Sequence, residues 1–166
     1  PRRYGLHATL VAPFRLAAGV GPEDVWRAAR RFAASRAAVR GVALRVSEDD
    51  GFVALRPARS VPAVDALAFD AVRCFEPLRA PLDAADRARR AVGLDARQLV
   101  LLDRWGYGRV AERFRFHLTL SGKLEAAARA DVAASARRVL LDEGLAGRAG
   151  CARLDVDGIA LFVEGE

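Results

Sequence analysis

Two copies of one tetrapeptide contain the scarcest reactive residues of this chain. His7, in YGLHATLVA, and His117, in FRFHLTLSG, each begin the sequence His-x-Thr-Leu, and they are the only histidines among 166 residues. Thr9 and Thr119 are likewise the only threonines. Imidazole is the side chain that gives or takes a proton near neutral pH, so a histidine pair indicates general acid–base catalysis.

The chemistry that fits such a pair is the cleavage of a phosphodiester. One imidazole would deprotonate the attacking oxygen, and the other would protonate the departing oxygen on the opposite side of phosphorus. The threonine hydroxyls can donate hydrogen bonds to the non-bridging phosphoryl oxygens, where charge is held in the transition state. Two histidines without clustered acidic residues form a poor ligand set, so we expect no metal and no cofactor. The sequence does not say which histidine is the base and which the acid.

A structural role competes with this interpretation at each motif taken alone. A single histidine in a strand is more often a hydrogen-bonded structural residue, and threonine is a good strand former. That explanation leaves open why both scarce residue types occur in two identical contexts. The pairing therefore favours function.

Strands are the elements that would position these side chains. Residues 4–10 and 114–121 are short apolar segments, and we expect both to be strands. Side chains alternate along a strand, so each histidine would share a face with the threonine two positions later. The neighbouring alanine and leucines would point into the core.

The rest of the chain alternates between helical and extended patterns. We expect a helix from Pro22 into the serine at 35, and a β-hairpin formed by 42–47 and 52–57. The 3.6-residue period then predicts helices at 64–75, 83–92, 95–104 and 125–143, a turn at WGYG (105–108), and a closing pair of strands at 152–157 and 159–164.

This order of elements repeats and predicts an α+β fold. A strand with His-x-Thr-Leu, a helix and a hairpin occur once in the first third and again in the last third. We therefore expect one domain over 1–166, with lobe one at about 1–60, a helical connection at about 61–110 and lobe two at about 111–166. The lobes would be related by a pseudo-twofold axis, and their small antiparallel sheets would line a central cleft with helices outside.

At this point the sequence resembles the two-histidine (2H) phosphoesterase superfamily, which is marked by a duplicated His-x-Thr/Ser motif. RYGLHATLVAPFRL, WGYG and FRFHLTLSGKL are similar to a bacterial branch associated with phosphonate metabolism operons. The resemblance implies metal-free hydrolysis of a phosphodiester, cyclic ones included, with both histidines catalytic and both threonines binding substrate. That branch commonly has a basic residue where Val11 stands, which leaves open whether Val11 weakens or abolishes activity. It also carries a stretch before RYG, so we expect upstream strands of the first lobe to be missing before Pro1.

Three further residues are candidates for binding phosphate. Tyr107, in the glycine-flanked turn, can hydrogen-bond phosphate or stack on a base, or it can simply plug the turn. Arg115 shares the strand face of His117 by parity and can clamp phosphate as a fork. Arg15 can replace the cation that Val11 lacks.

Composition limits the partners. The net charge is +6 and the pI about 10.5, but 26 of the 27 basic residues are arginine, as expected for a GC-rich genome rather than for a nucleic-acid groove. We expect a small phosphorylated metabolite as the partner, with RNA as a weaker alternative.

The mean hydropathy is +0.07, with no membrane span and no signal peptide, so we expect a cytoplasmic protein in which Cys74 and Cys151 stay reduced. The oligomeric state cannot be predicted.

Three functions follow from these expectations. The first is a metal-independent phosphodiesterase that opens a cyclic phosphate on a small sugar or nucleotide, of the 5-phosphoribosyl 1,2-cyclic phosphate type that the resemblance implies. The second is an enzyme acting on RNA ends that bear a 2′,3′-cyclic phosphate. The third is a module that binds a phosphate ester without turnover.

Overall fold

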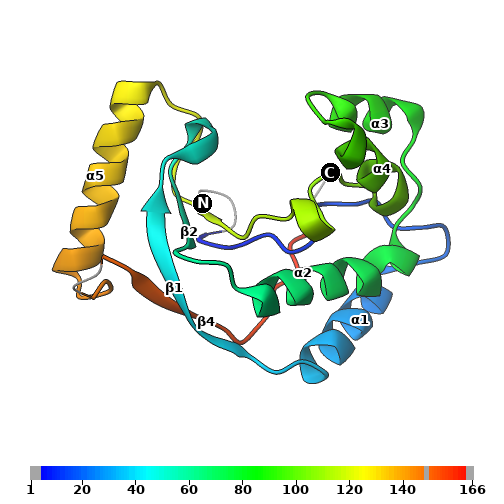
Figure 1. Ribbon diagram of the computed structural model, residues 1–166. Coiled ribbons are helices and arrows are strands. Elements are labelled where there is room, and N and C mark those ends of the chain that lie inside the picture. Colours follow the sequence, from blue (N-terminus) through cyan, green and yellow to red (C-terminus); the bar gives the residue numbers. More distant parts are fainter. Residues whose placement is uncertain (1–4, 148–149, 164–166) are drawn as a thin grey trace. The chain divides into compact units, whose positions relative to one another are not determined.

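The computed structural model describes residues 5–147 and 150–163 of the chain (Figure 1). Contacts divide the chain into two compact units. The sheet unit comprises 1–9, 37–61 and 116–158, and the helical unit comprises 10–36, 62–115 and 159–166. These units do not follow the lobes expected along the sequence, because the sheet unit takes segments from both lobes.

One antiparallel sheet forms the framework of the sheet unit. Its strands are β1 (Val39–Ser47), β2 (Ala54–Pro57), β3 (Leu118–Thr119) and β4 (Ala152–Val156), in the order β3-β2-β1-β4. The α+β class is therefore confirmed. The expectation of a separate small sheet in each lobe is wrong, because β1 pairs with β2 on one edge and with β4 on the other. Strands from the two expected lobes thus form backbone hydrogen bonds with each other.

The apolar face of this sheet holds part of the core. The side chains on it are at most 8 % exposed: Val42, Leu44, Val46, Leu55, Leu118 and Ala152. Helix α5 (Ala126–Asp142) packs against β1 and buries its Ala133 completely (Figure 1). We infer that α5 covers this face, since the buried apolar side chains need an apolar partner.

The opposite face of the sheet is polar and basic. In register, Thr119 stands opposite Ala54, Arg56 opposite Arg45, and Arg153 opposite Ala43. Cross-strand partners point to the same side, and residues two apart on one strand share a face. The arginines and Thr119 therefore lie on one face, away from the apolar side chains.

The hairpin between β1 and β2 agrees with the sequence expectation. Its connection contains the 3₁₀ turn Asp49–Gly51, in which Gly51 has φ +80. The Ser47 hydroxyl lies 2.5 Å from Asp49 Oδ2, and the Leu124 amide donates to the Gly51 carbonyl at 2.9 Å. The turn thus holds the segment that follows β3 next to the start of β2.

Four α-helices form the helical unit, and all four lie where the periodicity places them. They are α1 (Pro22–Ala34), α2 (Pro62–Phe75), α3 (Ala84–Ala91) and α4 (Ala96–Trp105). Pro22 occupies the first turn of α1, and α2 ends just before Pro77, as the chemistry of proline requires. Two apolar clusters join them, one built on Ala28, Ala29 and Phe75 and the other on Val72, Leu101 and Val110.

Two expected strands are wrong. Of the expected strand 4–10, residues 5–10 form no strand, and residue 4 lies outside the described part. Residues 159–163 also form no strand, and residue 164 of the expected strand 159–164 lies outside the described part. The apolar residues after β4 pack instead on the Ala28 cluster through Ile159 and Leu161. The expected strand 114–121 shrinks to Leu118–Thr119.

Candidate active site

The histidine and the threonine of both motifs belong to the sheet unit, whereas Leu10, the last residue of the first motif, belongs to the helical unit. His7 and Thr9 lie in the 1–9 segment of the sheet unit, and His117 and Thr119 lie in its 116–158 segment. The two histidines are 110 positions apart in the sequence. Folding therefore brings both histidines into one compact unit.

The second motif shows the alternation expected of a strand. Phe116 and Leu118 are each 6 % exposed, whereas His117 and Thr119 are half-buried. Leu118 pairs with Leu55 on the apolar face, so Thr119 lies on the polar face of the sheet. The imidazole of His117, which lies just before the strand, and the hydroxyl of Thr119 are thus both partly exposed.

His117 contacts an aromatic side chain that also contacts an arginine. The rings of Phe52 and His117 are 5.8 Å apart between centroids and tilted by 51°. The guanidinium carbon of Arg56 stands 5.8 Å from the centroid of the Phe52 ring. Packing against Phe52 restricts the orientation of the imidazole, and it places a cation near the same ring.

The first motif is held by its own backbone instead of by a sheet. Nδ1 of His7 lies 3.0 Å from the carbonyl oxygen of Gly5. A carbonyl oxygen only accepts hydrogen bonds, so Nδ1 is the donor in this contact and carries the proton. Gly5 has φ +71, a conformation in which glycine is favoured. His7 is half-buried and Thr9 is exposed.

Val11 belongs to the helical unit, which changes the meaning of its apolar side chain. It packs against both apolar clusters of that unit. Because 5–10 is not a strand, strand alternation does not place position 11 beside His7 and Thr9. Val11 packs in the core of the helical unit. Its apolar side chain is therefore no sign that a strand face beside His7 and Thr9 lacks a cation.

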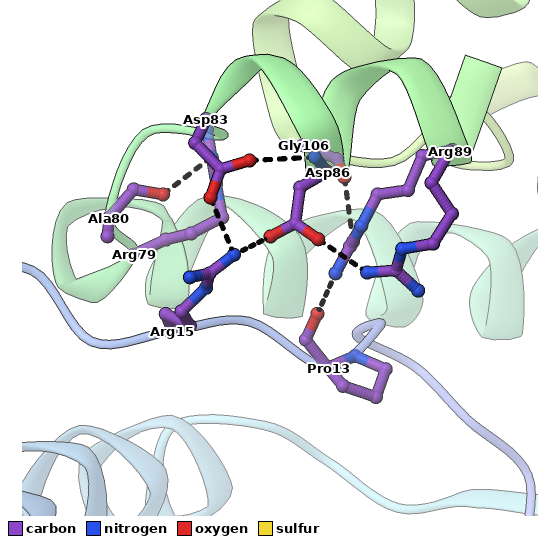
Figure 2. Close-up of polar contacts among 9 residues, drawn as sticks. Pro13, Arg15, Arg79, Ala80, Asp83, Asp86, Arg89 and Gly106 are labelled. Atoms are coloured by element: carbon purple, nitrogen blue, oxygen red, sulfur yellow. Dashed lines mark hydrogen bonds and ion pairs between the residues drawn. The ribbon is translucent and has the colours of Figure 1, made fainter.

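Arg15 is engaged by two carboxylates of the helical unit (Figure 2). Its guanidinium donates to Asp83 at 2.9 Å and also to Asp86. Hydrogen bonds from Arg89 and then from Arg15 lower the pKa of Asp86 to about 2, and Asp86 in turn raises the pKa of Arg15. The network ties the segment before α1 to the first turns of α3, and this pairing makes Arg15 less suited to bind phosphate.

Tyr107 lines a small pocket of the helical unit. Gly106 ends α4 in the left-handed conformation with φ 72, and Tyr107 follows with 37 % of its surface exposed. The empty space at the pocket is about 330 Å³ with open solvent included, and Tyr107 shares its lining with Phe14, Phe75, Arg79, Arg90 and Trp105 among others. Arg90 is occupied by the carbonyls of Pro13 (2.9 Å) and Gly106 (3.0 Å).

Arg115 lies at the end of the helical unit, next to the second motif in sequence. It is exposed, and its Nη1 donates to the carbonyls of Phe114 (2.7 Å) and Glu112 (3.1 Å). Residues 114–117 are not in a strand, so parity does not fix a shared face with His117. The structure thus groups the four motif residues in one unit, and Tyr107, Arg115 and Arg15 in the other.

Phe52 and Arg56 were missed by the sequence reasoning. Both lie in the hairpin segment 52–57 that was predicted, and their alternation with the buried Val53 and Leu55 was visible there. What the sequence did not show is that β2 pairs with β3, which brings this segment next to Thr119.

Among the described residues, no group of three His, Cys, Asp or Glu side chains is placed to hold a metal ion. In the same part of the chain, no helix is long and apolar enough to cross a bilayer.

Fold and site thus define an α+β chain that has two histidine–threonine pairs in one unit, with Thr119 of the second pair on the polar face of a small sheet. Comparison with known sequences gives the family: the chain belongs to the family described as "Protein of unknown function (DUF1045)", which matches residues 9–166. No solved structure shows significant similarity to it.

Two curated relatives carry the same name, Ribose 1,5-bisphosphate phosphokinase PhnN. The protein of Janthinobacterium sp. (strain Marseille) is 44 % identical over 124 residues, which is 74 % of this chain and 27 % of the relative. The protein of Laribacter hongkongensis (strain HLHK9) is 38 % identical over 164 residues, which is 99 % of this chain and 36 % of the relative. The chain thus spans only about a third of the length of these relatives.

Proposed function

We propose that the chain is a metal-independent phosphodiesterase in which His7 and His117 act as a general acid–base pair. The observation that carries the proposal is that all the histidines and threonines of the chain, two of each, belong to the same compact unit. The position of Thr119 on the polar face of the sheet, two residues after the half-buried His117, supports it further. Neither histidine is sequestered in the core, so both can meet a ligand.

In the proposed reaction, water attacks phosphorus in line with the leaving oxygen. One imidazole takes the proton of the water, the bond between phosphorus and the ester oxygen breaks, and the second imidazole protonates that oxygen. Thr9 and Thr119 donate hydrogen bonds to the non-bridging oxygens, which hold the charge in the transition state. At His7 the Gly5 carbonyl holds Nδ1–H, so the proton transfer uses Nε2 in either role.

The substrate class we propose is a cyclic phosphodiester of a small sugar in phosphonate metabolism. The relatives are named for ribose 1,5-bisphosphate, a sugar with phosphate on carbons 1 and 5. Hydrolysis of 5-phosphoribosyl 1,2-cyclic phosphate at the bond between phosphorus and the 2-oxygen would give this same compound. The two activities would then concern one sugar phosphate.

The kinase activity in the name of the relatives is not what we propose for this segment. Lys123 is the only lysine in the chain, and leucine follows it. The given sequence therefore has no Gly-x-x-x-x-Gly-Lys-Ser/Thr loop of the kind that cradles nucleotide phosphates. Phosphoryl chemistry on a ribose phosphate is the element that the proposal shares with these relatives.

The test is an assay of the full chain in EDTA with 5-phosphoribosyl 1,2-cyclic phosphate, a 2′,3′-cyclic mononucleotide, and an RNA ending in a 2′,3′-cyclic phosphate. We expect turnover of the first compound, and losses of roughly a hundredfold or more in kcat in both His7→Ala and His117→Ala, with unchanged circular dichroism. Turnover that needs added metal, or that survives either substitution, would contradict the proposal.

Two alternatives remain from the sequence, and the same assay separates them. Preference for the RNA end, together with binding that weakens steeply with salt, would favour an RNA-end enzyme. Measurable binding of the cyclic phosphates without turnover of any would favour a binding module.

A further inference from the structure

Helix α3 contains no apolar side chain larger than that of alanine. Its sequence, AADRARRA, consists of four alanines and four charged residues. All eight residues belong to the described part of the chain, and none of them is buried. Isolated helices shorter than about 12 residues are unstable in water, so a helix of this length depends on contacts with the rest of the protein. Contacts other than a buried apolar face must therefore hold α3 in place.

Polar contacts attach α3 to the helical unit. Arg87 donates to both carboxylate oxygens of Asp103 on α4, at 2.7 and 3.0 Å. Arg15, from the segment before α1, donates to Asp83 at 2.9 Å and also to Asp86 (Figure 2). In both arginines and in two of the three acids, about half of the side-chain surface or more is exposed. Exposed ion pairs contribute little to stability, and salt screens them.

Apolar side chains flank α3 on both sides. Leu82 and Leu94 are half-buried, and the side chain of Leu94 lies so close to Gly108 that a Cβ there would be 2.6 Å from it. Gly93, between α3 and Leu94, has φ +73 and lies in open space, with no atom within 4 Å of an added Cβ. Glycine changes its backbone angles at low cost, so this position can serve as a hinge. The segment 83–93 is thus anchored at its ends and weakly held between them.

Arg90 reaches from α3 into the pocket that Tyr107 lines. Its guanidinium donates to the carbonyl of Pro13 at 2.9 Å and to that of Gly106 at 3.0 Å. The residues on both sides of Pro13 line the pocket, and so does Gly106. Arg90 therefore links two walls of the pocket, and of the residues of α3, all of them described, it is the one in the lining.

We propose that residues 83–93 form a flap that is latched by charge and opens at a much lower free energy than the rest of the helical unit. Segments with few buried apolar side chains and exposed polar contacts open locally while the core stays folded. Neighbouring α4, in contrast, buries Leu101 and Leu102 and opens only with the core. Opening of the flap breaks the Arg90 link and admits small molecules to the pocket. The flap contains no histidine or threonine, and it does not depend on the proposed phosphodiesterase function.

Native-state hydrogen exchange of the full chain, without denaturant, measures this opening. After correction for intrinsic rates, the amides of 87–91 should exchange about a hundredfold faster or more than those of 99–105. Raising NaCl from about 0.05 M to about 1 M should accelerate exchange in 87–91 several-fold, because salt screens the latch. Slow exchange in 87–91 at the rate of 99–105, or a rate that does not respond to salt, overturns the proposal.

Exchanging the charges of one ion pair tests the latch itself. Arg87→Glu should accelerate exchange in 87–91, because it places two carboxylates side by side. Arg87→Glu combined with Asp103→Arg should return the rate close to that of the wild type, since the pair forms again with its charges exchanged. Arg97→Gln, which removes the contact of Arg97 with Glu112 outside the latch, should leave the rate within about twofold. Failure of the exchanged pair to restore protection would show that charge does not hold α3.

Quenching by acrylamide tests whether the flap closes the pocket. Trp26→Phe leaves Trp105, which lines the pocket, as the only tryptophan of the chain. In this background Arg90→Ala should increase the quenching of Trp105, because the link between the two walls is lost, and Arg97→Gln should not. Unchanged quenching in Arg90→Ala would overturn the role of the flap at the pocket.

Discussion

At the scale of single residues, the chemistry depends on how each motif side chain is held. His117 is restrained by the Phe52 ring, and His7 by the hydrogen bond from Nδ1 to the Gly5 carbonyl. Thr119 has its place in the ladder fixed by pairing with Ala54. Restraint of this kind matters because a catalytic group acts only when it is already oriented toward the reacting atoms.

Removing the hydroxyl of Thr119 tests whether this group stabilises the phosphoryl oxygens in the transition state. The change leaves both acid–base histidines in place. Thr119→Val keeps the shape and β-propensity of the side chain, so the free energy of unfolding should change little. We expect kcat for cyclic phosphodiester hydrolysis to fall roughly tenfold or more, because a donor to the phosphoryl oxygens is lost. Thr119→Ser, which keeps the hydroxyl, should recover most of the activity. Equal activities of the valine and serine variants would remove Thr119 from the site.

Part of this site could be predicted from the residues alone. Alternation correctly predicted that Leu118 and Thr119 point to opposite faces, because that rule is local, whereas His117 lies before the paired strand. The environment of Arg15 was not predictable in the same way. Asp83 and Asp86 lie about seventy positions later in the sequence, and only the fold brings them to its guanidinium.

At the scale of elements, helices were predicted well and strands less well. Helix signals such as Pro22 at a first turn or the glycine after Trp105 are local, and tertiary packing had only to agree with them. Strand formation depends on a partner elsewhere in the chain. The segment 5–10 has strand-like composition but no ladder partner, and Ile159 and Leu161 pack on helices instead.

The Asp86 network should stabilise the attachment of α3 in a pH-dependent way. The pKa of Asp86 is about 2 in the folded protein, below its ordinary value of 3.8, so the ionised form stabilises the fold. That contribution is fully present above about pH 4 and is lost as the pH falls through about 2. Asp86→Asn should therefore lower the unfolding midpoint at pH 6 and flatten its decline between pH 4 and 2. Asp131→Asn, an exposed change on α5, should behave as the wild type in the same calorimetric series.

Gly106, in the WGYG turn that holds Tyr107, should resist replacement because of its backbone conformation. It has φ 72, and a Cβ there would lie 2.9 Å from the Arg79 guanidinium. Gly106→Ala should lower the free energy of unfolding by about 1–2 kcal/mol from the left-handed conformation alone. Gly122→Ala, at a position with no atom within 4 Å of the added carbon, should cost much less in the same denaturant titration.

At the scale of the whole molecule, the chain enters the sheet unit three times, through 1–9, 37–61 and 116–158. These three segments contribute His7 and Thr9, then Phe52 with Arg56, and then His117 and Thr119. The order of elements along the sequence suggested two similar lobes, whereas the contacts combine segments of both into one sheet. Non-local pairing decided this outcome, and sequence periodicity carries no signal for it.

The central claim is that His7 and His117 act on one bound phosphate. Because the chain has only two histidines, the NMR signals of the imidazoles can test this claim directly. The imidazole nitrogens of a chain with two histidines give two sets of NMR signals, which His7→Gln assigns. Titration with inorganic phosphate should shift both sets, with one shared midpoint, if the two rings flank a single site. Shifts confined to one histidine, or two different midpoints, would contradict the account.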